Sequence, residues 1–280
     1  MFPRFSSLIA AFLAMFLLVS GACAEQEENG AYPESFSEFD YQTTLRYSQQ
    51  AIGRRLGDHR FINAAGREVR LSDYDGQPLV IQLIFTSCYH TCSLSTQHLS
   101  RIVQIGRGAL GQESFTVLTI GFDTARDTPE AMRSYARQQG VSLPNWEFLS
   151  TDQETIKALA AEIGFVYYPS PRGFDHLVQA SVIDQERVIY RQVYGEVFNT
   201  PLLVEPLKQL VFGGRTEETA LETLGNRVRL FCTTYDPKQD RYYFDYSLFV
   251  GMAIGALIIG STIAFLLREF VFRRRRTRTG

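Results

Sequence analysis

The stretch that decides the fold reads Leu79-Val-Ile-Gln-Leu-Ile-Phe-Thr-Ser-Cys88-Tyr-His-Thr-Cys92. Its first seven residues are apolar apart from one glutamine and predict a buried strand. Two cysteines four residues apart follow, at the point where the helical pattern Ser93-Leu-Ser-Thr-Gln-His98 begins. The amino end of a helix is electropositive, so it lowers the pKa of nearby thiols and favours the thiolate, which is both the nucleophile and the metal ligand. Strand, turn, dithiol and helix therefore predict a chemically active pair of cysteines.

Strand and helix patterns alternate on both sides of this stretch. Apolar and alternating segments predict strands at 79–85, 115–122, 145–149, 178–184 and 188–194, and a hairpin at 61–71. Helices are expected from Cys92 to Arg107, from Thr128, from Thr151 to Ile163 and from Pro201 to Phe212, with a loop at 169–173. Alternation that ends in a hairpin and a last helix predicts an α/β domain, a thioredoxin-like mixed sheet flanked by helices.

The composition allows one globular core and gives no sign of nucleic-acid binding. The chain has 280 residues, 45% apolar composition and a formal net charge of -2. That length and apolar content suffice to bury one sizeable core. A nearly neutral chain lacks the basic surface with which proteins bind nucleic acid, so we expect no nucleic-acid partner.

An uncharged apolar stretch near the carboxyl end predicts a transmembrane helix at 247–267, because about 20 apolar residues cross a bilayer. Arginines follow at once, with Arg268 and the run Arg273-Arg274-Arg275-Arg276 in the tail 268–280. Positive residues stay on the cytoplasmic side of a membrane, so we expect the tail in the cytoplasm and the main domain outside it. Residues 214–246 would then be a juxtamembrane segment.

The amino end predicts export. An apolar stretch from Leu8 to Val19 precedes a small-residue cleavage site at Ala22-Cys23-Ala24, so residues 1–24 are expected to form a signal peptide. Lipidation of Cys23 and retention of the segment as a second membrane anchor stay open. Residues 25–47 are polar and lack a periodic pattern, which predicts a flexible spacer. Both ends together predict a protein of the bacterial inner (cytoplasmic) membrane, with its main domain facing the periplasm or another extracytoplasmic side.

The spacing of Cys88 and Cys92 suits a bridging metal better than an unstrained disulfide. Helical residues i and i+4 have Cβ atoms about 5–6 Å apart, whereas a disulfide needs about 3.5–4.5 Å. If Cys88 precedes the helix this constraint relaxes, and a reversible disulfide stays open, as does the structural disulfide common in exported domains. Thiolates bind Cu(I), zinc or iron-sulfur centres, and one added imidazole makes a site that also holds Cu(II). Structural zinc normally has four protein ligands, and only three are visible.

Three segments resemble, in order and spacing, three signatures of the SCO/SenC family. They are Phe85-Thr-Ser-Cys-Tyr-His-Thr-Cys92, Gly121-Phe-Asp-Thr-Ala-Arg-Asp-Thr-Pro-Glu130 and Phe174-Asp-His-Leu-Val-Gln-Ala-Ser-Val-Ile-Asp184. Three segments in register over about 53–212 make the resemblance specific, where a CxxxC pair alone would be weak. The chain differs from the common pattern at Tyr89 and Ser93, where proline is frequent, and at Leu177, where serine is frequent. These differences leave the ligand residues in place and concern the rigidity of the loops.

The resemblance implies a membrane-anchored copper protein with a thioredoxin fold that helps to assemble cytochrome c oxidase. It implies that residues 48–213 form the copper-binding domain and that Cys88, Cys92 and His176 bind copper, as Cu(I) or Cu(II). The implied partner is subunit II of the oxidase, whose CuA site receives the metal from a metallochaperone. The same dithiol would be catalytic if the protein is a thiol-disulfide reductase instead. A redox sensor without copper delivery is a third interpretation.

Further residues carry weaker expectations. His90, between the cysteines, is expected to be at most an accessory ligand. Asp123 and Asp127 are expected to be structural or to support the ligand residues from behind, because carboxylates are favourable at the start of a helix. Cys232 can be a buried apolar residue, an intermolecular disulfide partner or an accessory thiol. The GxxxG motif at 251–255 can pack a partner helix, so a homodimer stays open.

Overall fold

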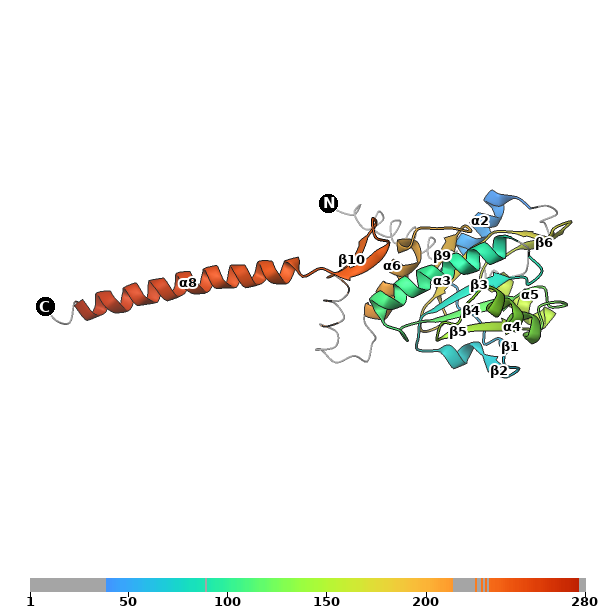
Figure 1. Cartoon of the computed structure of the whole chain (residues 1–280), viewed down its shortest axis with the longest axis horizontal. Helices are drawn as coiled ribbons and strands as arrows, with labels where there is room; N and C mark the ends of the chain where they lie inside the picture. Colours follow the sequence, from blue (N-terminus) through green and yellow to red (C-terminus); the bar gives the residue numbers. More distant parts are fainter. Residues whose placement is uncertain are drawn as a thin grey trace, which may run out of the picture. The chain divides into compact units, whose positions relative to one another are not determined.

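A mixed sheet of seven strands forms the centre of the domain (Figure 1). The computed structural model describes residues 39–88, 90–213, 225, 228, 230 and 232–276. In sheet order the strands are β2 Glu68–Arg70, β1 Arg60–Asn63, β5 Trp146–Ser150, β4 Thr116–Gly121, β3 Leu79–Ile84, β8 Gln179–Ile183 and β9 Ile189–Tyr194. The central strands β5, β4 and β3 are parallel, and each outer strand is antiparallel to its inner neighbour. This is the mixed sheet that the sequence predicts.

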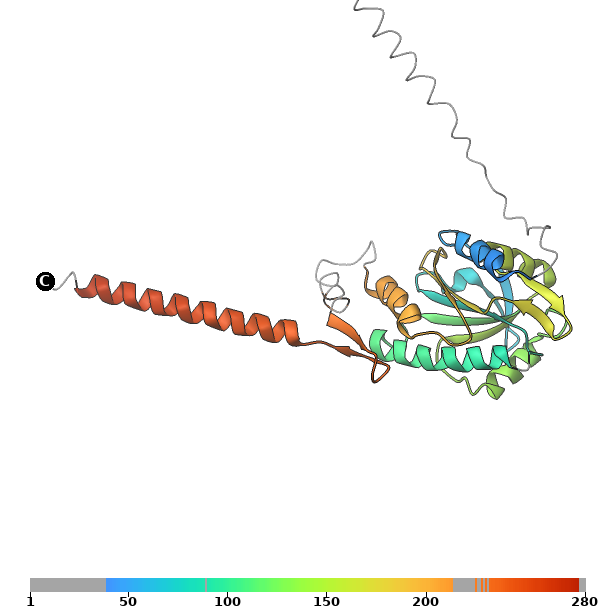
Figure 2. The ribbon, with the colours of Figure 1, turned by 90° about the horizontal axis from the view of Figure 1, so that it is seen from above.

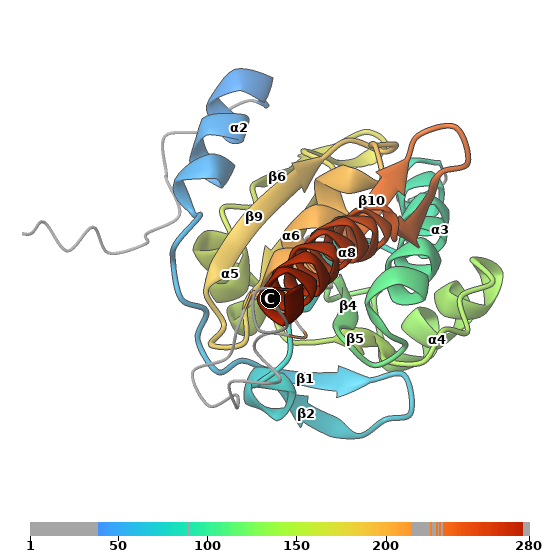
Figure 3. The ribbon, with the colours of Figure 1, turned by 90° about the vertical axis from the view of Figure 1, so that its left-hand side faces the viewer.

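Helices cover both faces of the sheet. The helices of the domain are α2 Tyr41–Gln50, the short 3-10 helix η1 Leu71–Tyr74, α3 Thr91–Leu110, α4 Pro129–Gln138, α5 Gln153–Glu162 and α6 Pro201–Phe212. The long helix α8 Ser247–Arg276 follows and does not cover the sheet. Figure 3 shows α3 and α4 on one side of the sheet and α5 on the opposite side. Helix α6 packs against α3, β8 and β9, so it shares the side of α3.

The centre of the domain follows the predicted pattern closely. Every residue of β3 and β4 is buried, as expected for parallel strands that are covered on both faces. Helix α4 begins as predicted, with Pro129 at its first position and the Thr128 side chain accepting a hydrogen bond from the N–H of Ala131 at 3.3 Å. Local signals thus fix where these elements begin.

Helix α2 corrects the predicted spacer. The spacer was expected to reach residue 47, but a helix begins at Tyr41, capped by Asp40, whose carboxylate accepts the N–H of Thr43 at 2.7 Å. Its buried Ser48 donates to the side chain of Gln179 in β8 at 2.9 Å. The helix escapes prediction because polar residues make these contacts and no apolar stripe marks it. The remainder of the predicted spacer, 25–38, lies outside the described residues.

A second correction concerns the predicted loop at 169–173. The chain there forms a small two-stranded sheet of β6 Tyr167–Ser170 and β7 Gly173–His176. Pro169 lies within β6, opposite Phe174. Proline is tolerated because β6 lies outside the main sheet and pairs on one side only. The last residue of the hairpin is His176, one of the predicted copper ligands.

The described part of the predicted juxtamembrane segment contains a third hairpin, β10 Thr233–Asp236 and β11 Arg241–Phe244. Strand β11 packs beside α3 (Figure 2). Within α8, Phe249–Arg268 is long and apolar enough to cross a membrane, by length and composition, and it overlaps the predicted span. The predicted signal peptide and the last residues of the predicted basic tail lie outside the described residues.

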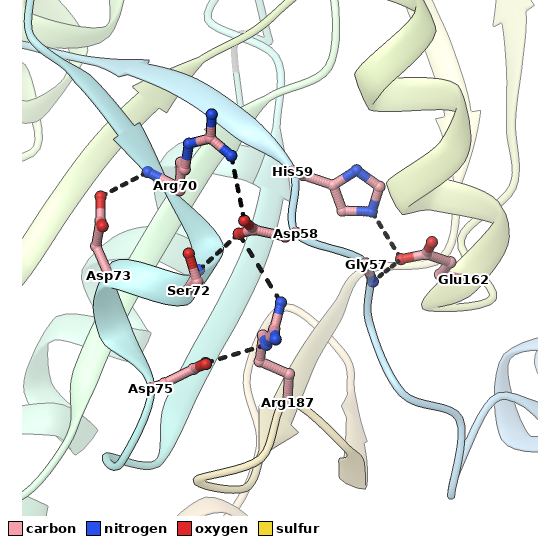
Figure 4. A network of polar contacts seen from close by, with 9 residues as sticks. All are labelled: Gly57, Asp58, His59, Arg70, Ser72, Asp73, Asp75, Glu162 and Arg187. Carbon is pink, nitrogen blue, oxygen red and sulfur yellow. Dashed lines mark hydrogen bonds and ion pairs between the residues drawn. The ribbon is translucent and has the colours of Figure 1, made fainter.

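A polar network fastens the segment that leads into β1 (Figure 4). Arg187, in the turn between β8 and β9, forms an ion pair with Asp58 at 3.8 Å. On the other side of the segment, Glu162 at the end of α5 accepts the N–H of Gly57 at 2.9 Å and contacts His59 Nε2 at 2.7 Å. The network therefore connects the segment before β1 to the β8–β9 turn and to the end of α5, and His59 contacts Glu162 as part of it.

The packing of α2 on the turn after α5 can be tested at Gly164. This residue has a φ of +67°, and an added Cβ would lie 2.7 Å from Ser48 Cα and 2.9 Å from Tyr47 O. Gly164→Ala should lower the free energy of unfolding by about 2–5 kcal/mol. This sum combines about 1–2 kcal/mol for the left-handed backbone with about 1–3 kcal/mol for overpacking. Urea unfolding followed by the fluorescence of Trp146, the single tryptophan, measures the change.

The matched control is Gly53→Ala. Gly53 also has a positive φ, +91°, but nothing lies within 4 Å of its added Cβ. Gly53→Ala should therefore lower the free energy of unfolding only by about 1–2 kcal/mol, the cost of the left-handed backbone. Equal losses in the two variants would show that α2 does not pack on Gly164.

Candidate metal and thiol site

The two cysteines lie at the junction of β3 and α3, where the sequence predicts them. Cys88 is in the turn after β3, and its N–H donates to Phe85 O at 3.1 Å. Cys92 lies in the first turn of α3 and is 2% exposed, whereas Cys88 is half-buried. The N–H of Cys92 donates to Cys88 Sγ at 3.4 Å, so the two residues are in contact. Because Cys88 precedes the helix, helical spacing does not hold the thiols apart, and a reversible disulfide stays compatible with this turn.

The pKa values of the two thiols shift in opposite directions. The Cys92 thiol donates a hydrogen bond to the Cys88 sulfur, and together with backbone N–H groups of the first turn it lowers the pKa of Cys88 to about 6. The same hydrogen bond, helped by burial, raises the pKa of Cys92 far above its usual range. At neutral pH Cys88 is therefore a thiolate and Cys92 the thiol that stabilises it. The accessible sulfur is the reactive one.

A buried carboxylate fixes the turn that carries Cys88. Asp127 is 1% exposed. One of its oxygens accepts the N–H and the hydroxyl of Thr86 at 2.8 and 2.7 Å, and the other accepts the N–H of Asp123 at 2.8 Å. Burial raises the pKa of Asp127. A side chain at Gly121 would collide with this carboxylate. Asp127 thus has the structural role that the sequence predicts.

His176, at the end of β7, is held in one tautomer. Its Nδ1 lies 2.8 Å from Leu177 O, and since a carbonyl only accepts, Nδ1 carries the proton and Nε2 keeps a lone pair. Burial lowers the pKa of His176 and favours the neutral ring. The rings of Phe122 and Phe165 lie with their centroids 5.4 and 5.3 Å from the imidazole. The ring of His176 is therefore neutral, and the lone pair of Nε2 is available to a metal ion.

Aromatic packing places the β6–β7 hairpin against the end of β3. The Phe85 ring lies 5.4 Å from the Phe174 ring and 6.0 Å from the imidazole of His176. Gly173, with a φ of +115°, allows this approach, because an added Cβ would lie 2.7 Å from Phe85 Cε2. The contact brings a histidine that is distant in sequence to the turn that precedes the cysteines.

Cys88 and His176 line one cleft. Its wall also includes His90, Thr91, Arg126, Arg172 and Glu196. Within the part of the chain that the structure describes, no three His, Cys, Asp or Glu side chains lie close enough together to hold a metal ion. The structure thus brings the two free cysteines into contact and places His176 in the cleft that Cys88 lines, while these described residues do not form a closed three-ligand site. The ligand assignment stays a prediction.

Three further histidine and cysteine side chains lie in different surroundings. His90 occupies the cap position before α3 and is exposed in the cleft, where its accessory role stays a prediction. His98 contacts the backbone of Phe198 through Nε2 at 2.7 Å. Cys232 is a buried free thiol, which agrees with the first of its three interpretations.

The sequence gives no indication of one residue in the cleft, Glu196. Its carboxylate accepts the hydroxyl of Thr91 at 3.1 Å, at the amino end of α3, where a negative charge is favourable. Glu196 lies in the loop between β9 and α6, which no motif marks. Only the fold brings it beside the cysteines.

The asymmetry of the dithiol predicts which cysteine reacts. Iodoacetamide should modify Cys88 at a rate that reaches half its maximum near pH 6, because only the thiolate reacts, whereas an ordinary cysteine reaches that point at about pH 8.5. Cys92 and Cys232 are buried and should stay unmodified in the folded chain. Mass spectrometry after timed exposure measures each rate.

Two variants serve as controls for this prediction. Cys92→Ala removes the hydrogen-bond donor and should move the midpoint of Cys88 upward. Cys232→Ala should leave it unchanged. A midpoint that does not respond to Cys92→Ala would contradict the proposed cause of the shift.

Comparison with known proteins agrees with this architecture. The SCO1 protein homolog of Bacillus subtilis (strain 168) is 26% identical over 147 residues, which cover 50% of this chain and 74% of that protein. The mitochondrial SCO1 homolog of Homo sapiens is 26% identical over 144 residues, 51% of this chain but only 46% of the human protein. The chain therefore matches less than half the length of the human relative.

Solved structures show the same fold. A crystal structure of a protein from Aquifex aeolicus VF5 has 25% identity and a TM-score of 0.53, over 60% of this chain and 99% of that one. A SCO1/SenC family lipoprotein from Bacillus anthracis str. Ames has 19% identity and a TM-score of 0.51, over 56% and 95%. The predicted thioredoxin-like fold is confirmed. A model of the SCO1/SenC family matches residues 48–211, more than half of the chain, and the chain belongs to that family.

Proposed function

We propose that the chain is a membrane-anchored copper metallochaperone that delivers copper to the CuA site in subunit II of cytochrome c oxidase. One observation carries the proposal: the Cys88 sulfur, in contact with Cys92, borders the same cleft as the ring of His176. Membership of the SCO1/SenC family and the three sequence signatures support it. Copper is in this view the cargo of the protein.

The donor set suits copper as cargo. Thiolate sulfur favours Cu(I), and two thiolates with one imidazole also accommodate Cu(II). Cys88 and His176 would bind first, because both border the cleft and both carry a lone pair at neutral pH. Cys92 must lose its proton to join them, so metal and proton compete for it. Ligands that face a cleft can be replaced one at a time by those of a recipient.

A second function, reduction of a disulfide at the recipient site, is favoured by the unequal thiols. The Cys88 thiolate would attack one sulfur of the recipient disulfide and release the other as a thiolate. Cys92, after losing its proton, would attack Cys88 Sγ in the mixed disulfide, break the bond between Cys88 and the recipient, and release the second recipient sulfur as a thiolate that takes a proton from water. The recipient then holds two thiols and the chain holds a Cys88–Cys92 disulfide, which a thiol reductant of the compartment must reduce again. A redox sensor without delivery would use the same pair.

The location belongs to the same proposal. Residues 247–267 would span the bacterial inner membrane, with the copper domain on the periplasmic side and the basic tail 268–280 in the cytoplasm. The apolar stretch Phe249–Arg268 and the arginines that follow it support this orientation. The signal-like residues 1–24 support export of the domain.

Copper binding tests the ligand set. The reduced full chain in detergent should bind one copper ion per molecule, and oxidation to the Cys88–Cys92 disulfide should abolish binding. Changes of residues that only orient a ligand weaken metal affinity about 10–100-fold, so loss of a direct ligand in His176→Ala should weaken it at least about 100-fold. Elemental analysis and competition with a Cu(I) chelator measure both quantities, and affinity should fall as pH falls.

Matched controls use residues outside the cleft. Cys232→Ala and His59→Gln should leave copper affinity unchanged, since Cys232 is buried elsewhere and His59 contacts Glu162. Tight copper in the oxidised chain or in Cys88→Ala would exclude the proposed site.

Delivery and reduction differ in their need for the imidazole. If the chain delivers copper, His176→Ala should impair oxidase assembly nearly as much as Cys88→Ala, while reduction of a model disulfide persists, because thiol exchange needs no third ligand. The measurements are CuA content and oxidase activity in cells that carry each variant, beside thiol exchange by the purified variants. Normal CuA loading with His176→Ala would assign the protein as a thiol reductase.

A further inference from the structure

Exposed aromatic side chains gather where β11 leads into α8. The exposed fractions are 45% for Tyr243, 66% for Tyr246 and 37% for Phe249. The Phe244 ring lies 4.8 Å from the Tyr246 ring and 5.9 Å from the Phe249 ring. The aromatic cluster therefore continues from the strand into the first turn of the helix. Phe244, Tyr246 and Phe249 form one cluster, and Tyr243 is exposed on the other face of the strand, so both faces beside the start of the helix carry aromatic side chains of the kind found at interaction surfaces.

The hairpin that carries this patch is attached to the domain. Asp240, between its strands, accepts hydrogen bonds from the hydroxyls of Thr200 and Tyr235 at 2.6 and 2.7 Å. The ammonium of Lys208, in α6, donates to Thr233 O in β10. Strand β11 also packs beside α3 (Figure 2). The segment between domain and apolar helix is therefore a folded and docked element, with Tyr243 on its exposed face.

The distance along the chain places this patch beside the membrane. The apolar span begins at Phe249. Tyr246 precedes it by three residues, and its carbonyl accepts the N–H of Val250 at 3.0 Å, so it belongs to the start of the helix. At about 1.5 Å per residue Tyr246 lies about 5 Å from the start of the span. The headgroup layer is about 5–8 Å thick on each side of the hydrocarbon core, which puts Tyr246 inside it. The end of β11, two residues earlier at Phe244, stays in this layer when the strand runs along the membrane surface, since two extended residues pointing away from it would add about 6–7 Å.

The backbone of the hairpin fits the headgroup layer better than the hydrocarbon core. Among the residues that the structure describes, strands β10 and β11 pair only with each other, so their outer edges carry N–H and C=O groups that need water. Such edges are excluded from hydrocarbon. Tyrosine has an apolar ring and a polar hydroxyl, and it is enriched at the membrane interface for that reason.

We propose that the β10–β11 hairpin lies in the lipid headgroup layer, with Tyr243 and Tyr246 in contact with lipid. The proposal rests on the proposed function only in requiring α8 to span the bilayer. Since the hairpin is docked on α3 and α6, this contact holds the domain against the membrane surface in a fixed orientation.

Tryptophan variants of the full chain test the contact. Tyr243→Trp, Tyr246→Trp, Phe265→Trp and Tyr41→Trp are each reconstituted into vesicles of phosphatidylcholine and phosphatidylglycerol. Some of the lipid carries bromine either near the headgroup or deep in the acyl chain. The wild-type chain, with only the buried Trp146, gives the background. Phe265, 67% exposed within α8, reports the span, and Tyr41, 51% exposed on α2, reports the distant surface of the domain.

The expected pattern is specific for each position. The Tyr243→Trp and Tyr246→Trp variants should show blue-shifted emission and be quenched most by bromine near the headgroup. The Phe265→Trp variant should be quenched most by bromine deep in the acyl chain. The Tyr41→Trp variant should not be quenched. If Phe265→Trp is quenched but Tyr243→Trp is as unquenched as Tyr41→Trp, the hairpin proposal is overturned and the membrane span stands. Blue-shifted emission at 243 without quenching would mean a protein partner, such as a second copy of the chain, and would overturn it as well. An unquenched 265 would overturn the span itself.

Discussion

The buried carboxylate of Asp127 holds together the two loops on which the site depends. It accepts hydrogen bonds from Thr86, directly after β3, and from Asp123, directly after β4. Parallel neighbours end at the same edge of a sheet, but nothing in the strands themselves fixes the loops that follow. Hydrogen bonds to a charged group contribute about 1.5–3 kcal/mol each, so three of them oppose the cost of burying Asp127, although burial still raises the pKa of this carboxyl group. The start of α3, and with it the dithiol, keeps its place because these loops are joined.

The turn held in this way makes the two cysteines chemically different. Cys88 precedes α3, so the first N–H groups of the helix point at its sulfur, whereas Cys92 lies within the helix and is buried. Helix ends leave such N–H groups without intrahelical partners, and a thiolate satisfies them. Position relative to the first turn thus separates a reactive sulfur from a protected one, although the residue type is the same.

Sequence patterns predict the part of the fold that apolar burial and local capping determine. The wholly buried strands β3 and β4 and the start of α4 at Thr128 belong to this part. Helix α2 could not be predicted, because the contact that holds it is a hydrogen bond from Ser48 to a residue 131 positions away. The sequence predicts a loop where the β6–β7 hairpin lies, because Pro and Gly usually end strands. The hairpin forms there because the ring of Phe85 packs on Gly173.

The candidate site divides in the same way. The cysteines are visible in local sequence, and their place at the strand-to-helix junction is confirmed. His176 is predicted as a ligand only by the resemblance to the family, since a single histidine has no pattern of its own. Glu196 could not be found at all, because its partner Thr91 is 105 positions away. Sequence patterns also could not predict the difference between the pKa values of the two thiols, because it depends on which residue begins the helix.

The three candidate ligands rest on elements of unequal rigidity, which bears on how a metal would be exchanged. The cysteines belong to a turn and a helix that are joined to the buried centre of the sheet. His176 belongs to a two-stranded sheet separate from the main one, held by aromatic rings. The hairpin is joined to the main sheet through side-chain ring contacts, whereas β3, which leads into the cysteine turn, is hydrogen-bonded to a neighbouring strand on each side. Closing the site on copper would therefore move the imidazole more easily than the thiols. Under the proposed function, the imidazole is then the first ligand to be replaced, and the two sulfurs hold the copper last, because the turn and α3 that carry them are joined to the buried centre of the sheet.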